Sequence, residues 1–276
     1  MQKINLLLIL IILAACKSLP VEKEPVFSLF FESIEAENIH QAVLFYRLKI
    51  ENPRKTPLIS QIRNYSVTIN GEKTEAVLQY ENLPQIKGGS LHETLLSLHL
   101  DMKEAGPENI NEDYYKIMLS LDLSNQYGSE TPFEEILSAI MEMPNIREPL
   151  FSITSIVIMQ DELINTKFAV NLHIENLNPF PLSLSAFNYK LYGDGLLWAQ
   201  GQEKDILTIQ GKGTEDAKLV MEMNFAEMRR SLLDQVIAMH QVNYRLNGTA
   251  EALIDIPWLT SFNLEFDRAG YSSVIK

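Results

Sequence analysis

The strongest constraint on the fold of this chain is an internal repeat. When Pro20 is placed on Pro144, an offset of 124 residues, the two halves align without a gap over most of one hundred residues. The matched residues, several of them proline, glycine or asparagine, include Ile50-Glu51-Asn52 with Ile174-Glu175-Asn176, Asn64-Tyr65 with Asn188-Tyr189, Gly71 with Gly195, and Gly89 with Gly213. Composition alone does not produce matches at one constant offset, so the sequence predicts two copies of one domain, residues 25–143 and 144–276.

Each copy has the residue alternation of β-strands. Phe168, Val170, Leu172 and Ile174 alternate with polar or small residues, which is the period of two expected for a half-buried strand. The segment Gly193-Asp194-Gly195 predicts a tight hairpin turn between residues 187–192 and 196–199. Short strands at regular spacing predict two tandem antiparallel β-sandwiches of about seven strands each.

A short helix is expected in each copy, so the predicted fold class is all-β with a minor α contribution. Asn224 followed by Glu227 is a capping-box signal. An apolar stripe at helical spacing follows it: Phe225, Met228, Leu232, Val236 and Met239. In the first copy, Gly106-Pro107 predicts a shorter helix that begins near Pro107.

The amino terminus carries an export signal. Lys3 precedes an apolar run over residues 4–15, which is shorter than the ~20 residues that a membrane-spanning helix needs. The run ends in Leu13-Ala14-Ala15-Cys16, which resembles the lipobox of bacterial lipoproteins, and Cys16 is the single cysteine of the chain. We therefore predict a signal peptide over residues 1–15, lipid attachment at Cys16 and a tether over residues 16–24. A plain secretory signal, or an uncleaved anchor with an incidental cysteine, is the alternative.

The charge of the chain restricts its partners. With 36 acidic and 23 basic residues, the formal net charge is −13. Nucleic acid is excluded as an expected partner, since phosphate binding needs a basic surface. An acidic protein gains nothing from anionic lipid headgroups, so membrane attachment is expected through acyl chains on Cys16. A lipidated Cys16 also leaves no free thiol for catalysis or metal binding.

The sequence contains no recognisable catalytic or metal-binding motif. The five histidines do not show the i, i+4 spacing of a zinc protease, and His92 and His99 are expected on opposite faces of one strand. Residues 211–214 lack the preceding glycine of a phosphate-binding loop and predict a β-turn. No serine occurs in a Gly-x-Ser-x-Gly elbow. We predict no metal, no cofactor, no catalytic residue and no enzymatic activity.

Motifs of the second copy resemble those of the LEA type 2 family, also called water stress and hypersensitive response (WHy) domains. The first segment that carries this resemblance is Ile174 to Leu182, which includes Asn176, Asn178 and Pro179. It is followed by Asn188-Tyr189, the turn at Gly195, and Trp198-Ala199 before Gly201. The first copy offers Ile50 to Arg54, with Asn52 and Pro53, then Pro57-Leu58 and Gly71. It departs from the family at Arg54 and at residues 74–77, and the second copy departs by inserting Leu177.

The resemblance implies a seven-stranded antiparallel sandwich with a helix at one end, and a non-enzymatic role in desiccation, cold or osmotic stress. Asparagine beside proline ends a strand and opens a turn, so Asn52, Pro53, Asn176, Asn178 and Pro179 are expected to shape a loop; ligand binding by that loop is the alternative.

Two functions fit these patterns. The first is a lipid-anchored protein that protects components of the bacterial cell envelope under stress, on its periplasmic or outer-surface side. The second is an envelope interaction or assembly module that binds a protein or lipid partner through an edge strand or a cleft between sheets. A hydrolase has no motif in its favour.

Overall fold

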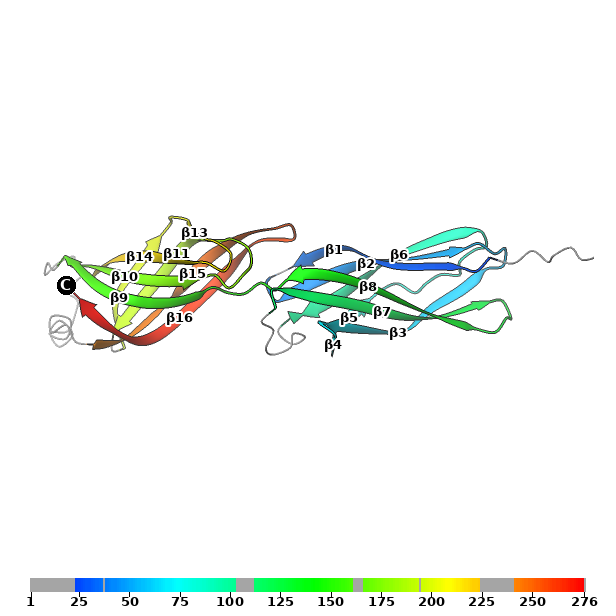
Figure 1. Cartoon of the computed structure of the whole chain (residues 1–276), viewed down its shortest axis with the longest axis horizontal. Coiled ribbons are helices and arrows are strands. Elements are labelled where there is room, and N and C mark those ends of the chain that lie inside the picture. The colour runs from blue at the N-terminus through cyan, green and yellow to red at the C-terminus, as the bar shows by residue number, and fades with distance from the viewer. Residues whose placement is uncertain are drawn as a thin grey trace, which may run out of the picture.

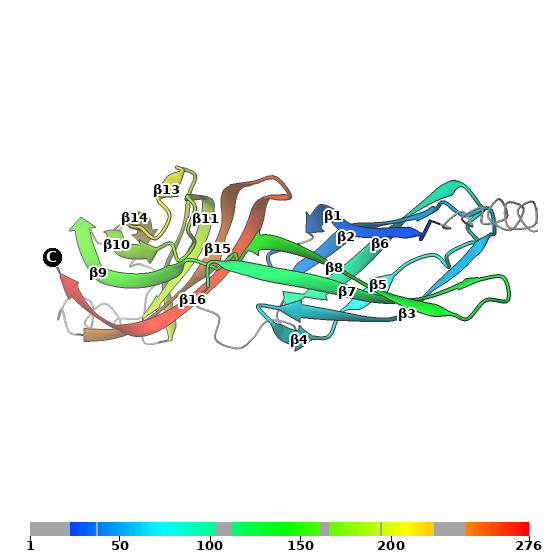
Figure 2. The same cartoon turned by 45° about the vertical axis from the view of Figure 1, so that its right-hand side comes forward.

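We describe the chain from a computed structural model, which covers residues 23–36, 38–102, 112–160, 166–193, 195–223 and 241–275. Every element with defined bounds in these ranges is a β-strand, and the strands form two bodies that lie end to end (Figures 1 and 2). No helix within these ranges has the length and apolar character needed to cross a membrane.

The first half contains two four-stranded antiparallel sheets. One sheet has the order β1-β2-β6-β5 and the other has the order β4-β3-β7-β8. The bounds are β1 Val26–Ala36, β2 Gln41–Asn52, β3 Leu58–Ile69, β4 Glu72–Thr74, β5 Val77–Gln79, β6 Ser90–Asp101, β7 Tyr114–Tyr127 and β8 Phe133–Pro144. Alternate side chains are buried along the central strands β2 and β7, as the period of two requires.

The second half forms a single eight-stranded sheet with the order β12-β14-β10-β9-β16-β15-β11-β13. The bounds are β9 Leu150–Gln160, β10 Thr166–Glu175, β11 Leu182–Gly193, β12 Leu196–Glu203, β13 Leu207–Ile209, β14 Thr214–Met223, β15 Gln241–Ile256 and β16 Leu259–Ile275. β12 pairs with both β11 and β14, so this sheet closes on itself. The closure buries a continuous core that includes Phe168, Leu191, Trp198 and Leu264.

The two halves share one strand order, because β1, β2, β3, β6, β7 and β8 correspond in sequence and pairing to β9, β10, β11, β14, β15 and β16. Two differences stand out. β12 is one strand where the first half has the separate strands β4 and β5, which are interrupted at Glu75 and Ala76. β9 and β16 pair through Ile156 and Val274, whereas β1 and β8, which are fully described, have no such pairing.

The all-β class is confirmed, and so is the hairpin at Gly193, where β11 and β12 pair antiparallel. The strand count of seven for each domain is not what the structure shows: the first half has two four-stranded antiparallel sheets, and the second half has one eight-stranded sheet in which β9 pairs with β16 in parallel. The helix expected from Asn224 to Met239 and the one near Pro107 lie outside the described residues.

Candidate functional site

The motif asparagines of the two copies occupy equivalent buried positions. Asn52 is fully buried, and its Nδ2 donates to the carbonyl oxygens of Thr56 (2.9 Å), Ile86 (3.1 Å) and Lys87 (3.3 Å). Its Oδ1 accepts from the Arg54 amide at 3.2 Å and from the Tyr127 hydroxyl at 3.1 Å. Both polar atoms of this side chain are therefore engaged in holding two loops together.

Asn176 repeats this arrangement in the second copy. Its Nδ2 donates to the carbonyls of Phe180 (2.8 Å), Gln210 (3.1 Å) and Ile209 (3.3 Å), and its Oδ1 accepts from the backbone and side-chain nitrogens of Asn178 at 3.0 and 2.9 Å. Asn176 is also fully buried. The side-chain amide of Asn176 thus connects the loop after β10 to the loop before β14.

The loops cross closely at two glycines that follow these contacts. A Cβ on Gly211 would lie 2.5 Å from the carbonyl oxygen of Pro179, and a Cβ on Gly88 would lie 2.1 Å from that of Lys55. Pro53 and Pro179 lie in these loops and are half-buried. The turn predicted at residues 211–214 is present, since the Gly213 amide donates to Gln210 at 2.9 Å.

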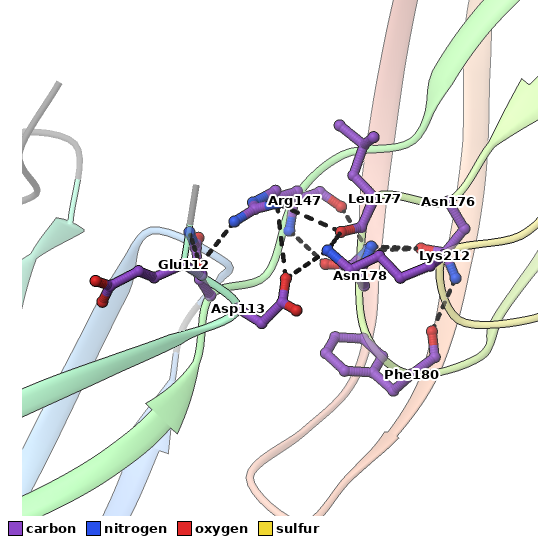
Figure 3. A network of polar contacts seen from close by, with 9 residues as sticks. Glu112, Asp113, Arg147, Asn176, Leu177, Asn178, Phe180 and Lys212 are labelled. Atoms are coloured by element: carbon purple, nitrogen blue, oxygen red, sulfur yellow. Dashed lines mark hydrogen bonds and ion pairs between the residues drawn. The ribbon is translucent and has the colours of Figure 1, made fainter. Parts of the chain in front are cut away.

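Asn178 connects the second-copy loop to the segment between the halves (Figure 3). Its Oδ1 accepts from the Arg147 amide at 2.7 Å, and its Nδ2 donates to the Arg147 carbonyl at 2.8 Å. This pair of bonds fixes the chain just before β9. At the matching position of the first copy, Arg54 Nε lies 3.4 Å from the Lys23 carbonyl, so both copies contact the segment that leads into their first strand.

A polar network then crosses to the end of the first half. The Arg147 guanidinium donates to the Glu112 carbonyl at 2.6 Å and lies 3.8 Å from the Asp113 carboxylate. Lys212 Nζ also pairs with Asp113 and donates to the Leu177 carbonyl at 2.8 Å (Figure 3). Burial raises the pKa of the nearby Tyr115 hydroxyl, and the charge of Arg147 opposes that rise.

Lys212 has an unusual backbone conformation for a residue with a side chain. Its φ is +56°, and its amide donates to the Asn178 carbonyl at 2.8 Å. In the first copy Gly89 takes this place, with φ +69° and its amide 2.9 Å from the Arg54 carbonyl. The left-handed region costs a lysine about 1 kcal/mol that glycine does not incur. The second copy therefore accepts backbone strain where its side chain reaches Asp113.

Apolar contacts accompany the polar network. Trp258, in the turn between β15 and β16, packs against the cores of both halves. Ala36 and Ile39, from the first half, pack against the core of the second. The junction thus buries apolar surface in addition to its ion pairs, and the two halves are joined as one unit.

Two open hollows lie on the sheets. The larger, of about 980 Å³, lies over β12, β11, β15 and β16 and is lined mainly by polar side chains. The other, of about 770 Å³, lies in the first half beside the interruption between β4 and β5. Its lining is mixed, with Val43, Val77 and Leu100 beside Lys73 and Asp101.

The remaining site predictions have mixed outcomes. Cys16 lies outside the described residues. His92 and His99 lie on β6, seven residues apart, and among the described residues no group of three or more His, Cys, Asp or Glu side chains is placed to hold a metal ion. Sequence reasoning missed Asp113, Arg147 and Lys212. In the alignment at an offset of 124 residues, Lys212 stands opposite Gly88, and this exchange of a glycine for a lysine was the signal that marks the junction. The strand pairing after the loop follows an offset of 123 residues, so Gly89 and not Gly88 occupies the place of Lys212, and the predicted match of Gly89 with Gly213 is wrong.

The comparison with protein families finds one match, to the LEA type 2 model, described as "Late embryogenesis abundant protein", over residues 171–270. These residues include Asn176, Asn178 and β11 to β15. The match supports an LEA type 2 domain in this part of the chain and suggests a non-enzymatic, stress-related class of protein. No curated protein matches the chain in sequence.

Solved structures resemble the chain only distantly. A protein from Archaeoglobus fulgidus is 16% identical with a TM-score of 0.31, covering 44% of this chain and 97% of its own. The periplasmic chaperone SfaE is 8% identical with a TM-score of 0.24, covering 92% and 100%. A glycosyl hydrolase family 2 member from Bacteroides cellulosilyticus DSM 14838 is 9% identical with a TM-score of 0.27, and the match spans 31% of that enzyme. At these TM-scores the similarities carry no functional argument.

Proposed function

We propose that this chain is a lipid-anchored, non-enzymatic protein of the bacterial cell envelope that protects envelope components against desiccation or osmotic stress. The LEA type 2 match over residues 171–270 is the observation that carries the proposal. The lipobox-like segment ending at Cys16 supplies the anchor, and the net charge of −13 keeps the protein soluble and self-repelling as water is lost.

The geometry of the motif loops supports a protein without a reactive site. The polar atoms of Asn52 and Asn176 are engaged by the backbone, and both side chains are buried. Binding by the loop, the alternative interpretation of this motif, would require breaking these bonds. The junction through Arg147 and Trp258 adds a second structural role, because it holds both halves as one shield.

Protection is tested by drying or freezing a labile enzyme with and without the protein. Recovered activity should exceed that given by an equal mass of albumin. An equal recovery with albumin would contradict the protective role.

Anchoring is tested separately through Cys16. The wild-type chain should incorporate radiolabelled palmitate in bacteria and partition into detergent, whereas Cys16→Ala should do neither. Labelling that persists in Cys16→Ala would remove the lipoprotein interpretation and leave the protection assay unaffected.

A second function, docking of an envelope partner, is favoured by exposed apolar residues on two edge strands of the first half. β1 and β8 each end a sheet and show no further pairing in the described chain. Both carry exposed apolar residues: Val26, Phe30, Ile136 and Ile140, with Ile136 73% exposed. β1 and β8 lie beside each other without pairing, and an unpaired sheet edge is a template for strand addition.

Proline substitution separates this function from shielding. Ile136→Pro or Ile140→Pro on β8 should abolish capture of a stoichiometric membrane partner while leaving protection of a dried enzyme intact. Capture of the same partner by both variants and wild type would rule out docking through β8.

A further inference from the structure

The groove over β12, β11, β15 and β16 carries two rows of polar side chains across the four strands. Strand pairing sets the rows: Asn188 lies opposite Gln202 and Thr249, and Thr249 lies opposite Glu265. The second row is Gln200, Lys190, Asn247 and Asp267. All eight residues line the same hollow of about 980 Å³.

These side chains differ from the motif asparagines in their hydrogen bonding. Gln200, Gln202, Asn247 and Thr249 make no side-chain hydrogen bond to any residue that the structure describes. Asn52 and Asn176, in contrast, have every polar atom engaged. The groove therefore presents donors and acceptors together, aligned by the pleat and available to a ligand.

The charge of the groove favours a neutral ligand. Its lining holds two cations, Lys190 and Arg268, and two anions, Glu265 and Asp267. Asp267 is further paired with Arg245, whose hydrogen bond lowers the pKa of that carboxyl. On a chain with a net charge of −13, this balanced surface is suited neither to a polyanion nor to a metal ion.

The two central strands beneath the groove, β11 and β15, cannot pair with a further strand. β11 pairs with β12 and β15, and β15 pairs with β11 and β16, so their backbone groups are already in ladders. A ligand in the groove must therefore be recognised by side chains. Amides, hydroxyls and carboxylates of this kind match the vicinal hydroxyls of a sugar chain.

Aromatic side chains continue the same face of the sheet. Tyr271 lies on β16 four residues beyond Asp267, on the same side of the strand, and is 76% exposed. Tyr192 lies on β11 two residues beyond Lys190 and is half-buried. A tyrosine ring offers a flat apolar surface with a polar edge, which suits the face of a pyranose ring.

We propose that this groove binds a neutral oligosaccharide, laid across the four strands and held by the two polar rows. Three gaps between adjacent strands span about 14 Å, which accommodates a few sugar rings. The inference goes beyond the protective role and does not rest on it, because it depends only on the groove.

Calorimetry of the full chain with cellohexaose, maltohexaose and chitohexaose tests the proposal. At least one should bind, and the affinity should not change between low and ~0.5 M salt, because a neutral oligosaccharide has no net charge for salt to screen. Gln200→Ala with Gln202→Ala should weaken binding about tenfold, and Thr249→Trp should block the groove and abolish binding. The matched control, Gln61→Ala with Gln79→Ala, removes two exposed amides of the first half and should bind like wild type.

Three outcomes would overturn the inference. No binding of any hexasaccharide at concentrations up to about 10 mM would do so, as would binding that the Gln200 and Gln202 double variant and Thr249→Trp leave unchanged. Binding of a neutral hexasaccharide abolished by ~0.5 M salt would show that the charged side chains, and not the neutral polar rows, govern the interaction. Circular dichroism of Thr249→Trp checks that the strand is intact; the exposed position on β15 tolerates an aromatic residue.

Discussion

Replacing Asn176 by alanine tests whether the LEA type 2 motif asparagine holds the second domain together. The side chain makes three donor and two acceptor contacts at 2.8 to 3.3 Å and is fully buried. Its two amide hydrogens serve three carbonyls, so about four full hydrogen bonds are lost. At a net ~1 kcal/mol each, Asn176→Ala should lower the free energy of unfolding by about 3 to 4 kcal/mol.

That loss is a large part of the ~5 to 15 kcal/mol typical of a folded domain, so partial unfolding at room temperature is an acceptable outcome. The chain has two tryptophans, both in the second half, and Trp198 is buried in its core. Urea unfolding followed by fluorescence in a Trp258→Phe background therefore reports the second half through Trp198 alone. Asn188→Ala, which removes an exposed amide with one local bond to Ala186, should change stability by less than ~0.5 kcal/mol.

If Asn176→Ala lowers the free energy of unfolding by less than about 1 kcal/mol, this reasoning is refuted, because the amide would then not stabilise the loops as its contacts indicate. Asn52→Ala is the matched experiment in the first copy, and should destabilise that half by a similar amount, since its contacts are equivalent. Far-UV circular dichroism reports the strands of both halves, so a transition seen by circular dichroism but not by Trp198 fluorescence belongs to the first half, which has no tryptophan.

Three further changes have defined outcomes. The Tyr46 hydroxyl is buried without a hydrogen-bond partner among the described residues, so Tyr46→Phe should raise the free energy of unfolding by about 1 kcal/mol in urea titrations. Burial raises the pKa of the Tyr46 hydroxyl, so the free energy of unfolding should fall as the pH rises above the ordinary value of 10.0, where the unfolded chain loses this proton first. Tyr46→Phe should reduce that alkaline loss of stability. An unchanged dependence of the unfolding free energy on pH would contradict this. A double-mutant cycle of Asp113→Asn with Lys212→Met should give a coupling energy of ~0.2 to 1 kcal/mol by fluorescence-monitored unfolding, because both groups are partly exposed. Lys212→Gly should leave the free energy of unfolding within ~1 kcal/mol of wild type, since relieved strain offsets the lost ion pair; a loss above ~2 kcal/mol would show that the contacts of Lys212 outweigh the strain and would contradict this balance.

Local features of the fold could be predicted from the sequence, and its closure could not. Alternation at Phe168 to Ile174 specified β10, and Gly193 specified the hairpin, because period and turn chemistry act over a few residues. The closure of the second sheet depends on β12 reaching both β11 and β14. The same register in the first half is broken at Glu75, so strand continuity there is decided by packing across the whole domain.

The residues of the candidate site also divide into those whose role the sequence could predict and those whose role it could not. A structural role for Asn52 and Asn176 followed from the chemistry of an asparagine beside a turn, since a short amide readily bonds nearby backbone. The junction was not predictable from local pattern, because Asp113 and Lys212 meet across 99 residues of sequence. The polar groove required strand register as well, since its eight residues come from four strands.

Comparison of the two copies also explains why Arg54 can replace the motif asparagine that Asn178 provides. Asn178 holds the backbone of Arg147, three residues before β9, through two bonds. Arg54 faces the equivalent segment before β1: its guanidinium lies 4.3 Å from the centre of the Tyr127 ring and 3.2 Å from the Glu24 carboxylate. Glu24 is 76% exposed, so the stacking on Tyr127, with Arg54 only 13% exposed, supplies the larger share of the contact. Each copy thus holds the segment that leads into its first strand. The second copy does so with the Asn178 amide, where the first half directly precedes β9, and the first copy does so with the stacked Arg54, where the predicted tether precedes β1.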